Sequence, residues 1–165
     1  RILEKARSVH VAGFRACYPV AFSLVYVYRL FRQSVHLADG HGGSLEMQLR
    51  AMEKADALVV ISFTPYSREA LYAAQTAKAA GCSIIAMTDS DASPISLLAD
   101  ETIRFAIHSP SFFPSIAAAT AVTEGLLAAL ASRAGKVGVK RIHQSENNLF
   151  LSGAYLQPPR ARKNG

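Results

Sequence analysis

The run LVVISFTPYSRE, residues 58–69, joins a buried strand to a helix through a turn rich in hydroxyl groups. Residues 58–61 are all branched and apolar, which is typical of a strand covered on both faces in a parallel sheet. Ser62, Thr64 and Ser67 follow within one turn, and a helical pattern then begins at Ser67. Backbone N–H groups and the positive end of a helix dipole meet in such a turn, so it suits a phosphate. The simpler alternative is a plain helix cap, with Thr64 as the N-cap residue.

The same alternation of strand and helix runs through the rest of the chain. Apolar, β-prone runs predict strands at 9–12, 35–37, 57–62, 83–88 and 102–107. Between them, helical patterns occupy residues 19–32, 45–55, 67–80 and 94–99. This order favours right-handed βαβ units. We therefore predict an α/β fold, a flavodoxin-like three-layer α/β/α sandwich with a five-stranded parallel sheet, and expect binding residues at the carboxyl ends of the strands.

Two helical segments need more cover than one subunit offers, and a third is predicted to be an interface helix. The segment 18–31 is apolar around nearly its whole circumference, and a helix of small residues is predicted at 116–132. A last helix is predicted at 139–156, where Ile142, Leu149 and Leu156 repeat every seven residues along one stripe. We predict that these surfaces form the interface of a homodimer or a larger assembly.

Composition indicates one domain. The chain has 165 residues, of which 50% are hydrophobic and 18% charged, enough for one substantial core. We assign residues 1–157 to this domain, with the last helix as an interface element. Residues 158–165, which contain Arg160, Arg162 and Lys163, are predicted to be a basic flexible tail.

Charge and cysteine content narrow the function classes. The formal net charge is +6, but the basic residues are scattered outside the tail and no base-reading helix is evident, so we expect no specific DNA binding by this chain alone. Cys17 and Cys82 are too few for a disulfide framework. The most apolar stretch is shorter than the ~20 residues that a membrane span needs, and no signal peptide is present. We expect a cytoplasmic protein without a membrane partner.

Two segments carry a resemblance to a known family. The run LVVISFTPYSRE and the later AKAAGCSIIAMTDSDASPISLLAD resemble the SIS (sugar isomerase) phosphosugar-binding domain, over about residues 7–133. In that family the third strand ends in a Ser-x-Ser-Gly-x-Thr-x-Glu turn that binds the sugar phosphate. Ser62 and Glu69 match this turn, Thr64 and Ser67 replace one hydroxyl with another, and Pro65 stands where the family usually has Gly. The resemblance implies a phosphorylated sugar or sugar acid as the ligand.

Finer features are similar to one branch of that family. The segments GFRACYPVAFSLVYVYRLFR, ISFTPYSRE and SPSFFPSIAAA resemble the effector domain of RpiR-type transcription regulators of carbohydrate metabolism. In those proteins a helix-turn-helix domain precedes the SIS domain. Nothing resembling it precedes Arg1, so the resemblance implies that this chain is the ligand-sensing part and that DNA is bound only through the missing domain. We expect no enzymatic activity. The alternatives are a phosphosugar aldose–ketose isomerase and an oligomerisation module with a decayed site.

The resemblance also selects the ligand-binding candidates, which are Ser62, Thr64, Tyr66, Ser67, Glu69, Arg15, Cys17 and Ser111. Arg15 and Cys17 replace the second Gly and the Ser of the family's first turn, Gly-x-Gly-x-Ser. Arg15 adds a cation that can form paired hydrogen bonds with a phosphate, whereas Cys17 is a weak hydrogen-bonding group.

Several candidates have structural alternatives. Tyr66 is placed to pack on a sugar ring, and Ser111 to contact the ligand or cap the following helix. Glu69 would be the general base of an isomerase, or it would serve the dipole of its helix. Asp39 and Asp89 end strands, as acceptors of sugar hydroxyls or as turn caps. No pair among the five histidines has metal-ligand spacing on a helix, so we predict no metal, no cofactor and no catalytic residue.

Overall fold

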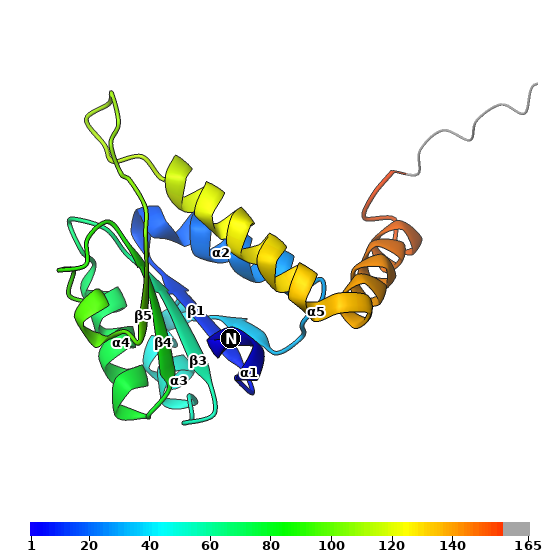
Figure 1. Ribbon diagram of the computed structural model, residues 1–165, viewed down its shortest axis with the longest axis horizontal. Coiled ribbons are helices and arrows are strands. Elements are labelled where there is room, and N and C mark those ends of the chain that lie inside the picture. The colour runs from blue at the N-terminus through cyan, green and yellow to red at the C-terminus, as the bar shows by residue number, and fades with distance from the viewer. Residues whose placement is uncertain (157–165) are drawn as a thin grey trace, which may run out of the picture.

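The structure is a computed structural model that describes residues 1–156. The predicted basic tail, 158–165, lies outside the described residues. Five strands form one all-parallel sheet in the order β2-β1-β3-β4-β5 (Figure 1). Their bounds are Val9–Gly13 for β1, Val35–Leu37 for β2, Ala57–Ile61 for β3, Ser83–Thr88 for β4 and Glu101–Arg104 for β5.

Helices cover both faces of this sheet, so the predicted three-layer α/β/α sandwich is confirmed (Figure 1). One face carries α2 and α5, and the other carries α3 and α4. The α-helices are α1 (Ile2–Lys5), α2 (Tyr18–Tyr28), α3 (Leu45–Arg50), α4 (Arg68–Ala79) and α5 (Ala117–Leu151). Short 3-10 helices are η1 (Arg15–Cys17), η2 (His41–Gly43) and η3 (Ser96–Leu98).

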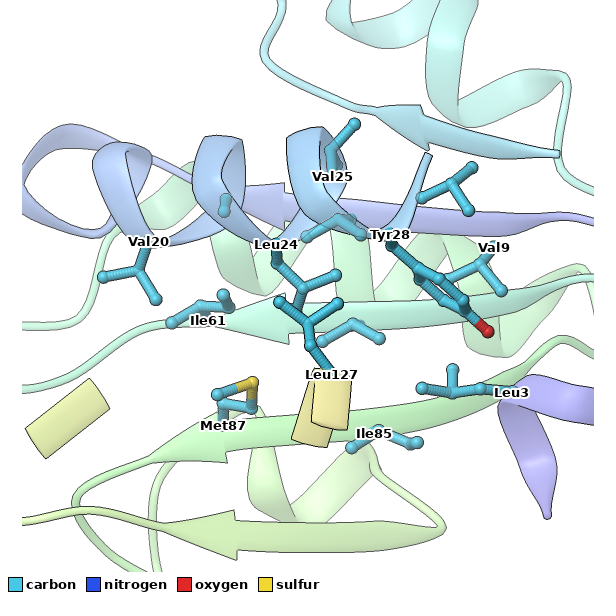
Figure 2. Close-up of a cluster of buried hydrophobic side chains, with 14 of the residues drawn as sticks. Leu3, Val9, Val20, Leu24, Val25, Tyr28, Ile61, Ile85, Met87 and Leu127 are labelled. Carbon is cyan, nitrogen blue, oxygen red and sulfur yellow. The ribbon is translucent and has the colours of Figure 1, made fainter. Parts of the chain in front are cut away.

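Two apolar cores lie on either side of the sheet. In the larger one, Leu24 of α2 and Leu127 of α5 point toward each other, while Val20 of α2 points at Ile61 of β3 (Figure 2), and both Leu24 and Ile61 are fully buried. In the other, Leu58 of β3 meets a row of buried alanines on α4, namely Ala70, Ala73, Ala74 and Ala77. Because alanine is small, α4 can pack closely on the strands, and its first turn is held at the edge of β3.

The register of the sheet places the carboxyl ends of β1, β3 and β4 at the same level. Gly13 of β1 is opposite Ile61 of β3, and Ile61 is opposite Met87 of β4. The segments that follow these strands therefore meet at the carboxyl edge of the sheet. This is the edge at which ligands bind in open α/β sheets.

The predicted helix at 45–55 is too long, because α3 ends at Arg50. The buried carboxylate of Asp56 accepts a hydrogen bond from the backbone N–H of Glu53 at 2.9 Å. It also accepts two from the Arg7 guanidinium, both at 3.1 Å. These contacts require the chain to leave the helix before Glu53. The helix predicted at 94–99 is reduced to the 3-10 helix η3.

The last two predicted helices are two halves of α5, separated by non-helical backbone at Gly135. The apolar stripe predicted along the last helix is wrong at its final residue, Leu156, which lies beyond the end of α5. Helix α5 stops at Leu151, Gly153 follows with a left-handed φ of 75°, and the backbone N–H of Ala154 donates to the carbonyl oxygen of Leu149. This closes the helix end, and Leu156 is left 96% exposed. None of the described helices combines the length and the apolar character of a membrane span.

Candidate functional site

The turn between β3 and α4 is held by its own hydroxyl groups. Ser62 is buried, and its Oγ accepts a hydrogen bond from the backbone N–H of Ser67 at 3.3 Å. Ser67 is the N-cap of α4, since its Oγ accepts from the backbone N–H of Ala70 at 3.1 Å. Ser67 therefore has the capping role that the simpler alternative gave to Thr64. Thr64 is exposed on the turn.

An ion pair connects this turn to the first one. Arg15, in η1 after β1, has a left-handed φ of 55°, and its Nη2 lies 3.0 Å from Oε1 of Glu69 on the first turn of α4. The other carboxylate oxygen, Oε2, is buried and has no hydrogen-bond partner among residues 1–156. The Glu69 backbone N–H and the Arg15 guanidinium lower the pKa of the Glu69 carboxyl. Glu69 is therefore ionised at neutral pH and is paired with a cation.

The first turn is packed more tightly than its sequence suggests. A Cβ on Gly13 would lie 2.8 Å from the Cβ of Ala21 and 2.8 Å from the carbonyl oxygen of Cys17, so β1 and α2 approach each other at a point where only glycine fits. Cys17 is 5% exposed, and burial raises the pKa of its thiol to about 11. The thiol is consequently protonated and packed inside, while the side chain of Arg15 is 74% exposed at the edge.

Tyr66 links the turn to the end of β4. Burial and then the neighbouring Asp89 carboxylate raise the pKa of the Tyr66 hydroxyl. Asp89 also accepts a hydrogen bond from Oγ1 of the buried Thr88 at 3.2 Å. The phenol ring is half-buried, so it flanks the hydroxyl-rich turn on the side of β4.

The geometry of three strand-end segments around one hydroxyl-rich turn agrees with a family match. The sequence profile of the SIS domain matches residues 2–131, most of the chain. This chain belongs to the SIS domain family. The recognition made from the turn motif is thereby confirmed.

Solved structures show the same fold. This SIS domain is similar to the sugar isomerase domain of an RpiR transcription factor from Sphaerobacter thermophilus, with a TM-score of 0.83 and 23% identity over 88% of this chain and 82% of that one. It is also similar to the Vibrio vulnificus NanR protein complexed with ManNAc-6P, with a TM-score of 0.77 and 16% identity over 93% of this chain but only 59% of NanR.

A third similar structure is that of a hypothetical protein from Methanococcus jannaschii, whose molecular function was inferred from its structure to be that of a 3-hexulose-6-phosphate isomerase. Its TM-score is 0.57, with 19% identity over 92% of this chain and 76% of that one. No curated protein matches the sequence significantly. Regulators and isomerase-like proteins thus share the fold of this SIS domain.

Ser111 lies apart from the turn of the SIS domain. It is exposed in the loop between β5 and α5, and its backbone N–H donates to Oγ of Ser109 at 3.1 Å. Figure 1 shows this loop extending away from the sheet. Ser115, nearer the helix, accepts a hydrogen bond from the backbone N–H of Ala117 at 3.2 Å. Ser115 therefore serves the start of the helix, which was the structural alternative for Ser111, and a ligand contact by Ser111 stays a prediction.

The remaining polar candidates have local structural roles. Oδ1 of Asp39 accepts hydrogen bonds from the backbone N–H of His41 at 3.0 Å and from Nε2 of Gln48 at 3.3 Å. Asp39 therefore caps its own turn. His10 and His36 lie side by side on β1 and β2, with ring centroids 5.4 Å apart. Within residues 1–156 no three His, Cys, Asp or Glu side chains gather as a metal site would require.

Sequence reasoning named Arg15 and Glu69 separately but missed that they form a pair. It also missed the proximity of Tyr66 and Asp89. The available signal was opposite charge for Arg15 and Glu69, and a hydroxyl donor with a carboxylate acceptor for Tyr66 and Asp89. In both cases the two residues follow neighbouring strands, since β1 and β4 both lie beside β3.

Proposed function

We propose that this SIS domain is the ligand-sensing domain of an RpiR-type helix-turn-helix transcription regulator of carbohydrate metabolism, and that its effector is a phosphorylated sugar or sugar acid. The observation that carries this proposal is the turn at residues 62–67. Among residues 1–156 the exposed Thr64 makes no side-chain hydrogen bond, and the Ser67 hydroxyl is used only as an acceptor, for the cap, so both can donate to a phosphate. The positive end of α4 lies behind both groups, and Arg15 stands at the rim.

The similarity to two regulators supports the sensing role. NanR was solved with ManNAc-6P, a phosphosugar, and the present turn has the hydroxyl and N–H groups that such a phosphate needs. We propose residues 1–157 as the effector domain, with DNA bound only by a separate helix-turn-helix domain in the cytoplasm. The ligand would stabilise one arrangement of subunits and so reset the spacing of the attached DNA-binding domains.

We expect phosphorylated sugars, with ManNAc-6P as the first to be tried, to bind this chain more tightly than their unphosphorylated forms. A hydrogen bond to a charged group contributes roughly 1.5–3 kcal/mol, so Thr64→Ala should weaken binding by about ten-fold or more. Thr64 is exposed, so the substitution should leave the fold intact. Calorimetric titration measures the affinity for each form of the sugar and the affinity of the variant. Ser132→Ala, on the exposed surface of α5, is the control. Equal affinity for both forms of each sugar would show that the turn is only a helix cap.

The electrostatics of Glu69 favour a sensor over an isomerase. A general base works best with a pKa near the operating pH, whereas the Glu69 backbone N–H and Arg15 lower the pKa of this carboxyl. We therefore expect negligible turnover of pentose, hexose and amino-sugar phosphates in a coupled assay. Robust turnover that is abolished by Glu69→Gln would instead support the isomerase alternative.

We also propose that this domain is a homodimer or a larger assembly through the outer face of α2. Tyr18, Phe22 and Tyr26 form a row there, with 40%, 50% and 49% of their surface exposed. Their rings stack at centroid separations of 6.2 and 6.3 Å. Beside the row is an apolar groove lined by Phe22, Val25, Tyr26, Leu37 and Leu149. A row of aromatic rings next to an apolar groove suits a second copy of the same surface.

Sedimentation at micromolar concentration is expected to show at least a dimer. Phe22→Asp should shift the protein to a monomer, since a two-fold interface would bury the new carboxylate twice. Met47→Asp, at an exposed site on α3, is the control. A clean monomer of the unmodified chain would contradict the proposal.

A further inference from the structure

A second hollow lies at the opposite, amino edge of the sheet, between α1, the end of α2 and α5. Its volume is about 760 Å³, within the range of roughly 300–1,000 Å³ found for small-molecule sites. Four arginines line it, against one acidic residue, Glu4. The arginines are Arg29, Arg32, Arg133 and Arg141. We call this hollow the arginine groove.

The positive charge of the arginine groove is only partly compensated. Arg133 pairs with Glu4, with 2.8 Å between Nε and Oε2. Arg32 donates to the carbonyl oxygens of Leu3 and Ala6, which hold it in place without neutralising it. In the part of the chain that the structure describes, Arg29, Arg32 and Arg141 form no ion pair with a carboxylate. Three positive charges in the groove thus lack an anion.

The break in α5 builds one wall of the groove. Gly135 has φ 57° and ψ −149°, a conformation open essentially to glycine alone. The second half of α5 therefore returns to the end of α2, where Oγ of Ser145 donates to the carbonyl oxygen of Leu30 at 2.9 Å. Nη1 of Arg141 reaches the carbonyl oxygen of Phe31 at 3.4 Å. Arg141 thus lies beside the arginines at the end of α2.

The chemistry of the lining selects the ligand class. Guanidinium groups form paired hydrogen bonds with phosphate oxygens, and the groove also presents neutral hydrogen-bonding side chains from Gln33, Ser34, Gln144 and Asn148. We propose that the arginine groove binds a small organic anion with at least two phosphate groups. Single-stranded nucleic acid fits less well, because it needs aromatic rings for stacking, and the rings of the lining, Tyr28 and Phe31, are buried.

The test is a calorimetric titration of the full chain with tripolyphosphate at low salt. Saturable binding at one site per chain is expected in the Ser67→Asp variant, in which the strand-end turn is blocked and only the arginine groove is left to bind the anion. In that variant, Arg29→Gln and Arg141→Gln should each weaken this binding by about ten-fold, since each removes charge-assisted hydrogen bonds. Arg50→Gln, which removes an exposed guanidinium on α3, should leave it unchanged. Ser67→Asp itself should leave the arginine groove unchanged, because the strand-end turn lies at the other edge of the sheet, so the two sites are tested separately.

Three results would overturn the proposal. The first is the absence of saturable tripolyphosphate binding by a chain whose circular dichroism is that of the folded protein. The second is equal weakening by Arg50→Gln, which would mean that net charge alone attracts the anion. The third is tight binding of a short DNA duplex that depends on Arg29 and Arg141 while tripolyphosphate fails to bind, since the groove would then be a nucleic-acid surface.

Discussion

Replacing Ser67 with aspartate is expected to abolish the binding of phosphorylated sugars while the domain remains folded. Ser67 caps α4 through its side-chain oxygen, and aspartate is an equally good N-cap residue. The helix should therefore start at the same residue. The added carboxylate would occupy the place of the phosphate and repel it, so we expect a loss of affinity of about a hundred-fold or more, several kcal/mol at close range.

Ser67→Asn is the matched control, because asparagine has nearly the shape of aspartate, also caps helices and carries no charge. It removes one hydroxyl and should weaken binding by about ten-fold. Calorimetry with ManNAc-6P measures both variants, and thermal unfolding checks that they fold alike. Equal affinities for Ser67→Asp and Ser67→Asn would contradict a phosphate site at this turn.

Leu24→Ala is expected to lower the free energy of unfolding by about 2–5 kcal/mol. The Leu24 side chain is fully buried between α2 and the sheet, so truncation removes apolar contacts and leaves a cavity. Leu97→Ala is the matched control, since Leu97 is 76% exposed and such surface changes usually stay within about 0.5 kcal/mol. Urea denaturation at one fixed protein concentration gives both values, because the proposed association would also contribute to stability. A loss below about 1 kcal/mol for Leu24→Ala, no larger than an average substitution, would contradict this packing.

The sequence predicts the centre of this fold better than its margins. Strand β4 was predicted with its observed bounds, Ser83–Thr88, because a strand covered on both faces needs an unbroken apolar run. Strand β5 was expected at 102–107 but spans Glu101–Arg104. It lies at the edge of the sheet, with its two inner residues partly buried and its two end residues exposed, so little hydrophobic pattern marks where it begins and ends.

The candidate site also has a part that the sequence predicts and a part that it does not. The hydroxyls of Ser62 and Ser67 could be read from the turn because the chemistry of a helix N-terminus is local. The Arg15–Glu69 pair could not, since it depends on β1 lying next to β3 in the sheet. The burial of Cys17 depends on the close approach of β1 and α2 at Gly13, which no spacing along the chain reveals.

The two outermost strands limit how copies of this chain can associate. β2 has only three residues and β5 only four, and β5 begins and ends with the exposed charged residues Glu101 and Arg104. Short, charged edge strands offer little backbone for another strand to join. Sheet extension, which would lead to open-ended aggregates, is therefore disfavoured, and contacts between copies are directed to the helical faces, where two-fold pairing closes on itself.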